Sequence, residues 1–190
     1  KLRNHPSIIL WSGDNECDQF IVAIGLDPSA NRITREVLPQ VISRLDPYRP
    51  YLPSSPYFSP EAYKLASGNQ DKMRSLLPEQ HLWGPRDYYK SSFYAQATSH
   101  FTSEIGYHGC NNLSSIRKFI SEEKLWPWQN NDEWLTHATE MYGEKGPYAY
   151  RIKLMADQIR EMFGFDPDNI EDFIIASQIS QAEAKKFFIE

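Results

Sequence analysis

The sequence predicts an α/β fold, and three observations support this prediction. Short apolar runs rich in β-branched and aromatic residues are followed by longer amphipathic segments. The runs are continuous rather than alternating, which is typical of parallel strands covered on both faces. Two of the runs end in a carboxylate, at Glu16 and at Glu104. In βα units such positions lie at the carboxyl edge of the sheet, where functional side chains gather.

The first predicted strand is Ser7–Ser12, which reads Ser-Ile-Ile-Leu-Trp-Ser after a proline and ends in the polar turn Gly13–Asn15. Apolar residues then recur at spacings of three and four and predict a helix over Thr34–Leu45, capped by its first residue. Pro39 lies inside this helix and is expected to kink it. Asp46 and a following proline end it.

The middle of the chain is predicted to be mostly irregular. Residues 49–57 hold too many prolines for a central strand longer than two or three residues. Residues 54–86 read as a long loop with one helical turn, and loops of such length in compact domains are usually functional or mobile. A second strand follows at Phe101–Gly106, and it contains Glu104.

The last part of the chain is predicted to be helical. Gly143 and Gly164 are expected to stop two of the helices, because glycine adopts the left-handed conformation that ends a helix. The predicted helices are Ser115–Glu122, Asp132–Tyr142, Tyr148–Phe163 and Ile170–Ile189. The tryptophans of this part are expected in the core or at a domain contact, at Trp126, Trp128 and Trp134.

Composition excludes several classes of protein. With 190 residues, 41% of them apolar, the chain can form a core. The net charge of −5 argues against a nucleic-acid or anionic-membrane partner. No apolar run is long enough to span a bilayer, and Lys1–Pro6 carries no apolar segment of a signal peptide. Cys17 and Cys110 are expected to be reduced thiols.

No cofactor or metal site is predicted. The histidines lack the spacing of a zinc site, and two cysteines are too few for one. The sequence also lacks a glycine-rich phosphate loop and a nucleophilic Ser/His arrangement. What stands out is the carboxylate pair, because glycoside hydrolysis needs two carboxyl groups flanking the bond. Most of the 25 acidic residues are expected on solvated surfaces or at helix caps, whereas Glu16 and Glu104 follow strands.

The chain resembles glycoside hydrolase family 2, which includes β-galactosidases, β-glucuronidases and β-mannosidases. Residues 3–16, Arg-Asn-His-Pro-Ser-Ile-Ile-Leu-Trp-Ser-Gly-Asp-Asn-Glu, resemble the family's acid/base signature, and residues 101–106 look like its nucleophile strand. Gln80–Gly84 is similar to the end of the sixth barrel strand in the mannosidase-like branch. Asp46–Pro50 and Ala176–Glu183 resemble the approach to the fifth strand and the helix before the eighth, so the resemblance spans the chain.

The resemblance implies a partial (β/α)8 TIM barrel running from about strand 4 through helix 7, with a helix-rich C-terminal half. Residues 1–190 would then be part of one catalytic barrel domain, without the family's N-terminal sandwich domains, barrel strands 1–3 and strand 8. A barrel piece has open sheet edges and an unfilled interior. We therefore expect the isolated chain to be inactive and to self-associate through those edges.

The resemblance also implies roles for named residues in a retaining β-glycosidase that acts by double displacement. Glu16 would be the acid/base that protonates the departing oxygen, and Glu104 the nucleophile that forms a covalent glycosyl intermediate. Asn15 would hydrogen-bond the sugar 2-hydroxyl. The residues expected to bind substrate are Asn15, His81, Trp83 and Tyr107.

The substrate is predicted to be a terminal β-mannoside, and alternatives stay open. Mannosidase-like members usually have a second Asn where this chain has Asp14, which leaves β-galactosidase and β-glucuronidase as alternatives. A non-catalytic, carbohydrate-binding barrel remnant is a further alternative. The presence of both Glu16 and Glu104 argues against a remnant, which has no chemical need for either.

Overall fold

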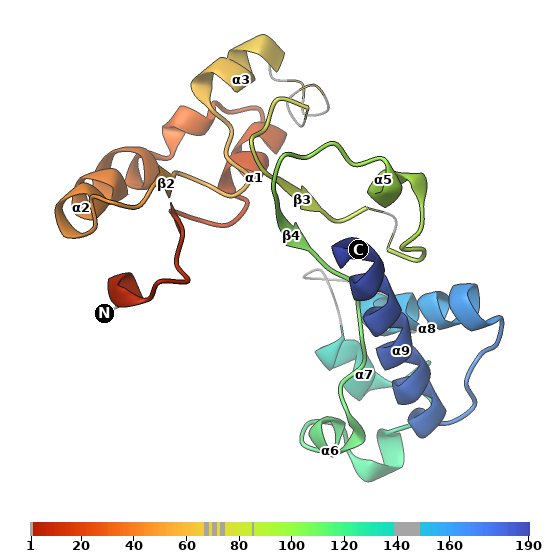
Figure 1. The fold of residues 1–190 in the computed structure, drawn as a ribbon. Helices are drawn as coiled ribbons and strands as arrows, with labels where there is room; N and C mark the ends of the chain where they lie inside the picture. Colours follow the sequence, from red (N-terminus) through yellow and green to blue (C-terminus); the bar gives the residue numbers. More distant parts are fainter. Residues whose placement is uncertain (1, 67–68, 70–71, 73–74, 85, 139–148) are drawn as a thin grey trace. The chain divides into compact units, whose positions relative to one another are not determined.

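A computed structural model describes residues 2–190 except for 67–68, 70–71, 73–74, 85 and 139–148 (Figure 1). The chain divides into two compact units. The first unit is Lys1–Leu82 with Thr98–Ile105, and the second is Trp83–Ala97 with Gly106–Glu190. The predicted carboxylates both belong to the first unit, and most of the helical C-terminal part belongs to the second.

The first unit holds two short parallel strand pairs, as expected for βα architecture. Strand β1 (Trp11–Ser12) pairs with β2 (Tyr51–Leu52), and β3 (Gln80–Leu82) pairs with β4 (Thr102–Ile105). In the described residues the two pairs do not join into one sheet. The fold is therefore mixed α/β, as predicted, whereas the partial barrel stays a prediction.

Strand β1 is shorter than predicted, covering Trp11–Ser12 rather than Ser7–Ser12. Its partner explains the difference. Trp11 donates a backbone hydrogen bond to the carbonyl of Pro50, and Gly13 donates one to Leu52. Pro50 has no N–H to donate, so the ladder does not extend further on that side. Ile9 is 66% exposed, which shows that the apolar run alone did not define a buried strand.

The predicted helix over residues 34–45 is present with a correction at its start. Residues Ile33–Val37 (η3) form π-helical turns, and the α-helix α2 begins at Leu38 and ends at Leu45. Pro39 lies in the first turn of α2, directly after the π-helical turns, and the Thr34 carbonyl, five residues before it, accepts from the Tyr51 hydroxyl at 2.6 Å. Thr34 is not the cap: it is buried, and its hydroxyl donates to the carbonyl of Asn31.

Short helices complete the first unit and bury a small core. Val22, Phe58, Ala66 and Leu77 are buried together with Tyr63 packed against them. The described helices other than α2 and η3 are η1 (Leu2–Asn4), α1 (Cys17–Ala23), η2 (Pro28–Ala30) and α3 (Pro60–Ala66). Helix α3 lies in the stretch that was predicted to be irregular with one helical turn.

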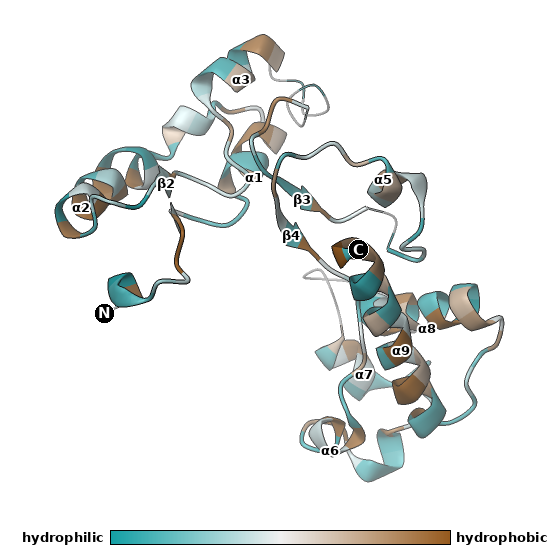
Figure 2. Cartoon of the chain, viewed as in Figure 1, coloured by the Kyte–Doolittle hydropathy of each residue, from teal (hydrophilic) through white to brown (hydrophobic). Residues whose placement is uncertain are grey.

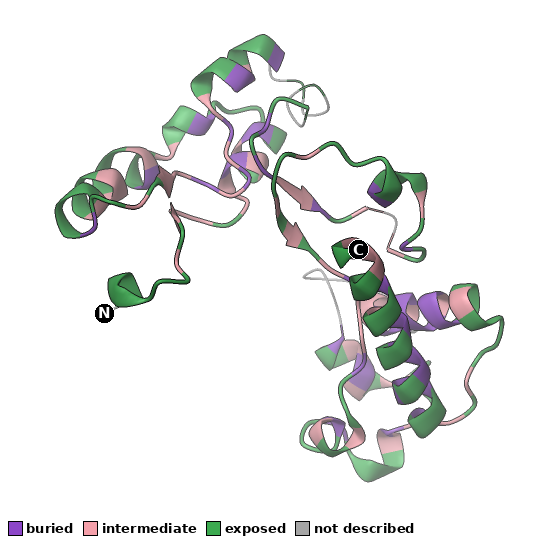
Figure 3. Ribbon diagram, in the orientation of Figure 1, coloured by how far each residue is buried: buried purple, intermediate pink, exposed green. Residues whose placement is uncertain are grey.

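The second unit is largely helical and holds a main hydrophobic core and a smaller cluster of Tyr89, Tyr107 and Ala184. Helices α8 (Tyr150–Phe163) and α9 (Ile170–Ile189) lie against each other, and their facing sides are buried (Figures 1 and 3). Trp128 and Trp134 are buried in the main core, as expected. The shorter elements are α5 (Ser92–Ala95), α6 (Leu113–Ile116), η4 (Glu122–Lys124) and α7 (Asp132–His137).

Helix limits in this unit follow capping residues. Helix α6 starts at Leu113 because the Asn112 side chain accepts from the Ser115 N–H, so the prediction of Ser115–Glu122 was wrong at both ends. Gly164 ends α8 with φ 74°, as predicted. Helix α9 has the predicted bounds. Helix α7 ends at His137 with Ala138 as its C-terminal cap, and the remainder of that predicted helix, from residue 139 on, lies outside the described residues with Gly143.

Polarity agrees with burial only in part in these two helices. The buried residues of α8 and α9 are mostly apolar, whereas α9 also has apolar residues at its surface, including Ile175 and Ile179, which are 57% and 44% exposed (Figure 2). None of the described helices is long and apolar enough to cross a bilayer. Both cysteines are free thiols, and burial raises the pKa of Cys110 to about 12.

Candidate active site

Three side chains from separate elements of the first unit converge. Glu16 stands at the start of α1, His81 on β3 and Glu104 on β4. The Nδ1 atom of His81 lies 3.0 Å from Glu16 Oε1 and 3.4 Å from Glu104 Oε2. Each of the three side chains has one nitrogen or oxygen atom in this cluster, and these three atoms all lie within 4.8 Å of one another. The two predicted carboxylates are therefore neighbours, with His81 between them.

The register of β3 and β4 explains why His81 and Glu104 are neighbours. His81 is the direct partner of Glu104 in the parallel pair, and an irregularity in the pairing lies between Gln80 and His81. Directly opposed residues on neighbouring strands project from the same face of a sheet. His81 is thereby placed beside Glu104, although the sequence gives no sign of the irregularity that sets this register.

Glu16 is held by an unusual backbone. Its φ of 60° and ψ of 6° are left-handed, a conformation that costs a residue with a side chain about 1–2 kcal/mol. Its N–H donates to the carbonyl of Ser55 at 2.7 Å. Non-glycine residues in this region persist where their surroundings fix them, and they cluster at functional sites. The strained backbone and the converging side chain therefore point to the same residue.

Asp14 fixes the turn that precedes Glu16. One of its carboxylate oxygens accepts from the Ser54 hydroxyl at 2.5 Å and from the Cys17 N–H at 3.3 Å. The other accepts from the Asn31 amide at 2.8 Å. A carboxylate can accept all three bonds at once. The Asp found where the resembling sequences usually have Asn is therefore an anchor of this turn.

Behind His81 lies a polar network, centred on the buried Glu79, that the sequence did not reveal. His81 Nε2 lies 2.9 Å from the hydroxyl of Ser55, which donates to Glu79 Oε2 at 3.0 Å. The Ser103 hydroxyl also donates to Glu79 Oε2, and the Tyr57 N–H donates to Oε1 at 2.9 Å. Ser55 and Glu79 fall in the stretch predicted as a loop, which offers no register for predicting contacts.

Burial differs sharply across the site. The His81 side chain is 3% exposed, whereas Glu16 is 25% and Glu104 37% exposed. The imidazole is therefore beneath the carboxylates, which reach solvent and so a substrate. Two carboxylates this close repel each other unless a proton or a positive charge lies between them. The His81 ring is placed to share such a proton.

The same three side chains also have the spacing of ligands in a cation site. Among the described residues, this is the cluster that has such a spacing. Imidazole and carboxylate ligands suit first-row divalent metals. The spacing of histidines and cysteines along the sequence does not reveal this cluster, because Glu16, His81 and Glu104 come together only in the folded chain. The absence of a metal stays a prediction.

Asn15, the fourth residue of the predicted site in the first unit, precedes Glu16 and is exposed. Its backbone forms a parallel bridge with Ser55, outside the two strand pairs. The bridge ties the end of β1 to the segment after β2, so Asn15 is fixed by its main chain while its side chain remains at the surface.

Trp83 and Tyr107 belong to the second unit. Trp83 is 37% exposed, and its ring lies so close over Gly106 that a Cβ there would be 2.4 Å from Cη2. Tyr107 is buried, its hydroxyl donates to the Asp87 carbonyl at 2.8 Å, and its pKa is raised by burial. Their contacts with a sugar stay predictions.

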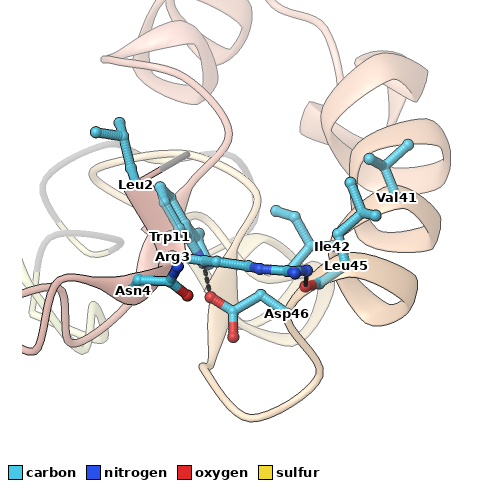
Figure 4. Close-up of a pocket in the computed structure, with 8 residues that line it drawn as sticks. All are labelled: Leu2, Arg3, Asn4, Trp11, Val41, Ile42, Leu45 and Asp46. Carbon is cyan, nitrogen blue, oxygen red and sulfur yellow. Dashed lines mark hydrogen bonds between the residues drawn. The ribbon is translucent and has the colours of Figure 1, made fainter.

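The first unit also has an apolar hollow of about 600 Å³, at a different set of residues (Figure 4). Val41, Ile42 and Leu45 of α2 line one side, and Trp11 and Asp46, which are joined by a hydrogen bond, also line the hollow (Figure 4). None of Glu16, His81 and Glu104 lines it. Because this hollow lacks converging catalytic groups, we assign the candidate site by its chemistry and not by the size of a cavity.

No family model matches the chain. It is 25% identical to β-mannosidase B of Aspergillus niger and 23% identical to β-mannosidase of Bos taurus, over 98% of this chain and 22% of each relative. The crystal structure of β-D-mannosidase from Dictyoglomus thermophilum matches with a TM-score of 0.70 and 27% identity, over 99% of this chain and 21% of that one.

These likenesses agree with one another, and they support a relationship to glycoside hydrolases of the β-mannosidase type. The chain spans about a fifth of the length of the curated relatives it matches. The match covers nearly all of this chain, including Glu16, His81 and Glu104.

Proposed function

We propose that residues 1–190 are part of the catalytic domain of a retaining β-glycosidase that acts on β-mannosides. The observation that carries this proposal is the pair of carboxylates, Glu16 and Glu104, brought together on His81 Nδ1. The names of the similar proteins supply the sugar, since each is a β-mannosidase. The carboxylate pair supplies the chemistry.

The spacing of the pair favours a retaining mechanism. Retaining glycosidases hold the two carboxyl groups about 5–5.5 Å apart, and inverting ones about 6.5–9.5 Å apart to admit a water. An oxygen of Glu16 and an oxygen of Glu104 lie within 4.8 Å of each other. This close approach is nearer to the retaining spacing than to the wider inverting one, so it supports direct attack by one carboxylate.

In the proposed reaction Glu104 attacks the anomeric carbon and forms a glycosyl ester, while Glu16 gives its proton to the departing oxygen. The aglycone leaves as an alcohol. Glu16 then removes a proton from water, which attacks the same carbon and releases Glu104. Asn15 precedes Glu16 and is exposed, and in the proposed reaction its amide hydrogen-bonds the sugar 2-hydroxyl.

The test uses the longest polypeptide that the source genome encodes around these residues. We expect it to hydrolyse 4-nitrophenyl β-mannoside faster than the β-galactoside or β-glucuronide. Glu104→Gln should abolish turnover, and Glu16→Gln should lower it by about 10²–10⁴-fold for substrates with poor leaving groups. Preference for another sugar would select one of the alternative specificities. Sugar binding without turnover would favour the binding remnant.

One observation favours a second candidate, a divalent-cation site, because Glu16, His81 and Glu104 have the spacing of metal ligands. The two candidates make different predictions. A glycosidase of the proposed kind keeps its activity in excess EDTA and shows no saturable heat of zinc or manganese binding. Binding that His81→Gln removes, together with loss of activity in EDTA, would select the cation site instead.

A further inference from the structure

We propose that Glu79 is a positioning residue: through Ser55, its buried carboxylate fixes the proton of His81 on Nε2 and so holds a second proton between His81 Nδ1 and Glu16. The kinetic consequence rests on the proposed function, whereas the position of the imidazole proton does not.

Glu79 is the buried end of the network. Glu79 is 3% exposed, and its carboxylate accepts from the Tyr57 N–H and from the hydroxyls of Ser55 and Ser103. A buried carboxylate costs much less when several donors satisfy it. An ionised carboxylate only accepts hydrogen bonds, so both hydroxyl hydrogens point toward Glu79.

Ser55 then transmits this polarity. A serine hydroxyl has one hydrogen, and that of Ser55 is committed to Glu79 Oε2 at 3.0 Å. Toward His81 Nε2, 2.9 Å away, the Ser55 oxygen can only accept. The hydrogen of that bond therefore resides on Nε2. The tautomer of a histidine is set in this way by the partner of its other nitrogen.

The consequence reaches the proposed acid. In the neutral imidazole with Nε2 protonated, Nδ1 is an acceptor, and it lies 3.0 Å from Glu16 Oε1. A hydrogen bond at that distance requires one proton between the two atoms, on Glu16 or on Nδ1. Glu104, at 3.4 Å, has the longer contact. The network thus places a proton at Glu16, which needs one to give to the departing oxygen, rather than at the nucleophile.

Glu79 also connects the two strands that carry the site. It accepts a hydrogen bond from Ser103, which is the residue before Glu104 on β4, and it directly precedes the first residue of β3. A purely structural role would therefore be an alternative explanation. The two roles differ in what they affect: a structural lesion lowers the amount of folded enzyme for every substrate, whereas a misplaced proton affects only steps that need the acid.

The first experiment places the proton. Solid-state 15N NMR of the full-length protein labelled at histidine, with His81 assigned by its loss in His81→Gln, should show Nε2 protonated. In Glu79→Gln the new amide can donate to Ser55, whose hydrogen then turns to His81, so Nε2 should lose its proton. A protonation state of Nε2 that is unchanged in Glu79→Gln would overturn the proposal.

The second experiment separates positioning from folding. Glu79→Gln and Ser55→Ala should lower kcat/KM by about 10–100-fold for an alkyl β-mannoside, which needs the acid. For 2,4-dinitrophenyl β-mannoside, whose leaving group needs no proton, the change should stay within a few-fold. Ser55→Thr keeps the hydroxyl and should restore kcat/KM for the alkyl β-mannoside.

Asp46→Asn is the matched control, because it alters another buried carboxylate of the first unit away from this network. Asp46→Asn should lower kcat/KM equally for both substrates, or for neither of them. An equal loss for both substrates in Glu79→Gln and Ser55→Ala would assign Glu79 a structural role. If the wild-type protein cleaves no mannoside, the proposed function fails, and the NMR result still decides the role of Glu79.

Discussion

At the scale of single residues, the backbone of Glu16 shows how function and stability oppose each other. A left-handed conformation is costly for glutamate and nearly free for glycine. At Glu16 the strain is maintained by the Ser55 carbonyl and by the turn that Asp14 anchors. A carboxylate needed at this position accounts for a residue that is unfavourable for folding.

Glu16→Gly is therefore predicted to raise the free energy of unfolding by about 1 kcal/mol while it removes turnover. Asn130→Gly is the control, because Asn130 also has a positive φ, 54°, and lies in the second unit. It should give a smaller gain, since Asn tolerates this conformation better, and leave kcat unchanged. Urea denaturation with activity assays measures both; a destabilised Glu16→Gly would contradict the account.

At the scale of elements, Asp46 joins the end of α2 to β1. The Trp11 indole N–H donates to its carboxylate at 3.0 Å, and Arg49 lies 2.7 Å from the same oxygen. These partners, the Trp11 bond first, lower the pKa of Asp46 below its ordinary value of 3.8. A lowered pKa in the folded state means that ionised Asp46 stabilises the fold.

This contribution is complete above pH 3.8 and is lost as the pH falls through the lower folded-state pKa. Asp46→Asn should therefore be less stable than wild type at pH 6, and the difference should shrink toward pH 2. Thermal unfolding between pH 2 and 7 measures it. A difference that is constant across this range would show that the hydrogen-bond geometry, and not the charge, matters.

The sequence predicted best those elements whose signals are local. The apolar periodicity of α9 is sustained along the helix, and Gly164 is the residue type best suited to a positive φ. The predicted bounds of α9 and the predicted stop at Gly164 were therefore both confirmed. Strand β1 was predicted too long because its length depends on a proline-rich partner distant in sequence. Helix α6 was misplaced because Asn112, rather than the apolar pattern, sets its start.

The site follows the same division. Glu16 follows β1 after a short turn and Glu104 lies in β4, so both are near strands that the sequence predicted, and a resemblance to known sequences identified His81. Glu79 and Ser55 have no local signal, because their importance arises from contacts with residues far away in the chain. Buried polar residues inside an apparent loop are invisible to periodicity, although they determine where a proton lies.

At the scale of the whole molecule, the chain spans about a fifth of its curated relatives, and its strand pairs are short. Two-stranded sheets have open edges, which favour pairing with other chains. We predict that residues 1–190 alone hydrolyse no β-mannoside and self-associate, as measured by light scattering coupled to size exclusion. A monodisperse, active monomer would contradict this prediction.

The most direct test of the central claim is to trap the glycosyl intermediate on the full-length protein. A 2-deoxy-2-fluoro-β-mannoside with a dinitrophenolate leaving group should form an ester that turns over slowly, and mass spectrometry of the digest should locate it. We expect one fluorosugar on the peptide that contains Glu104, and none in Glu104→Gln. A label on another residue, or β-mannoside hydrolysis with inversion and no label, would contradict the assignment of Glu104 as the nucleophile.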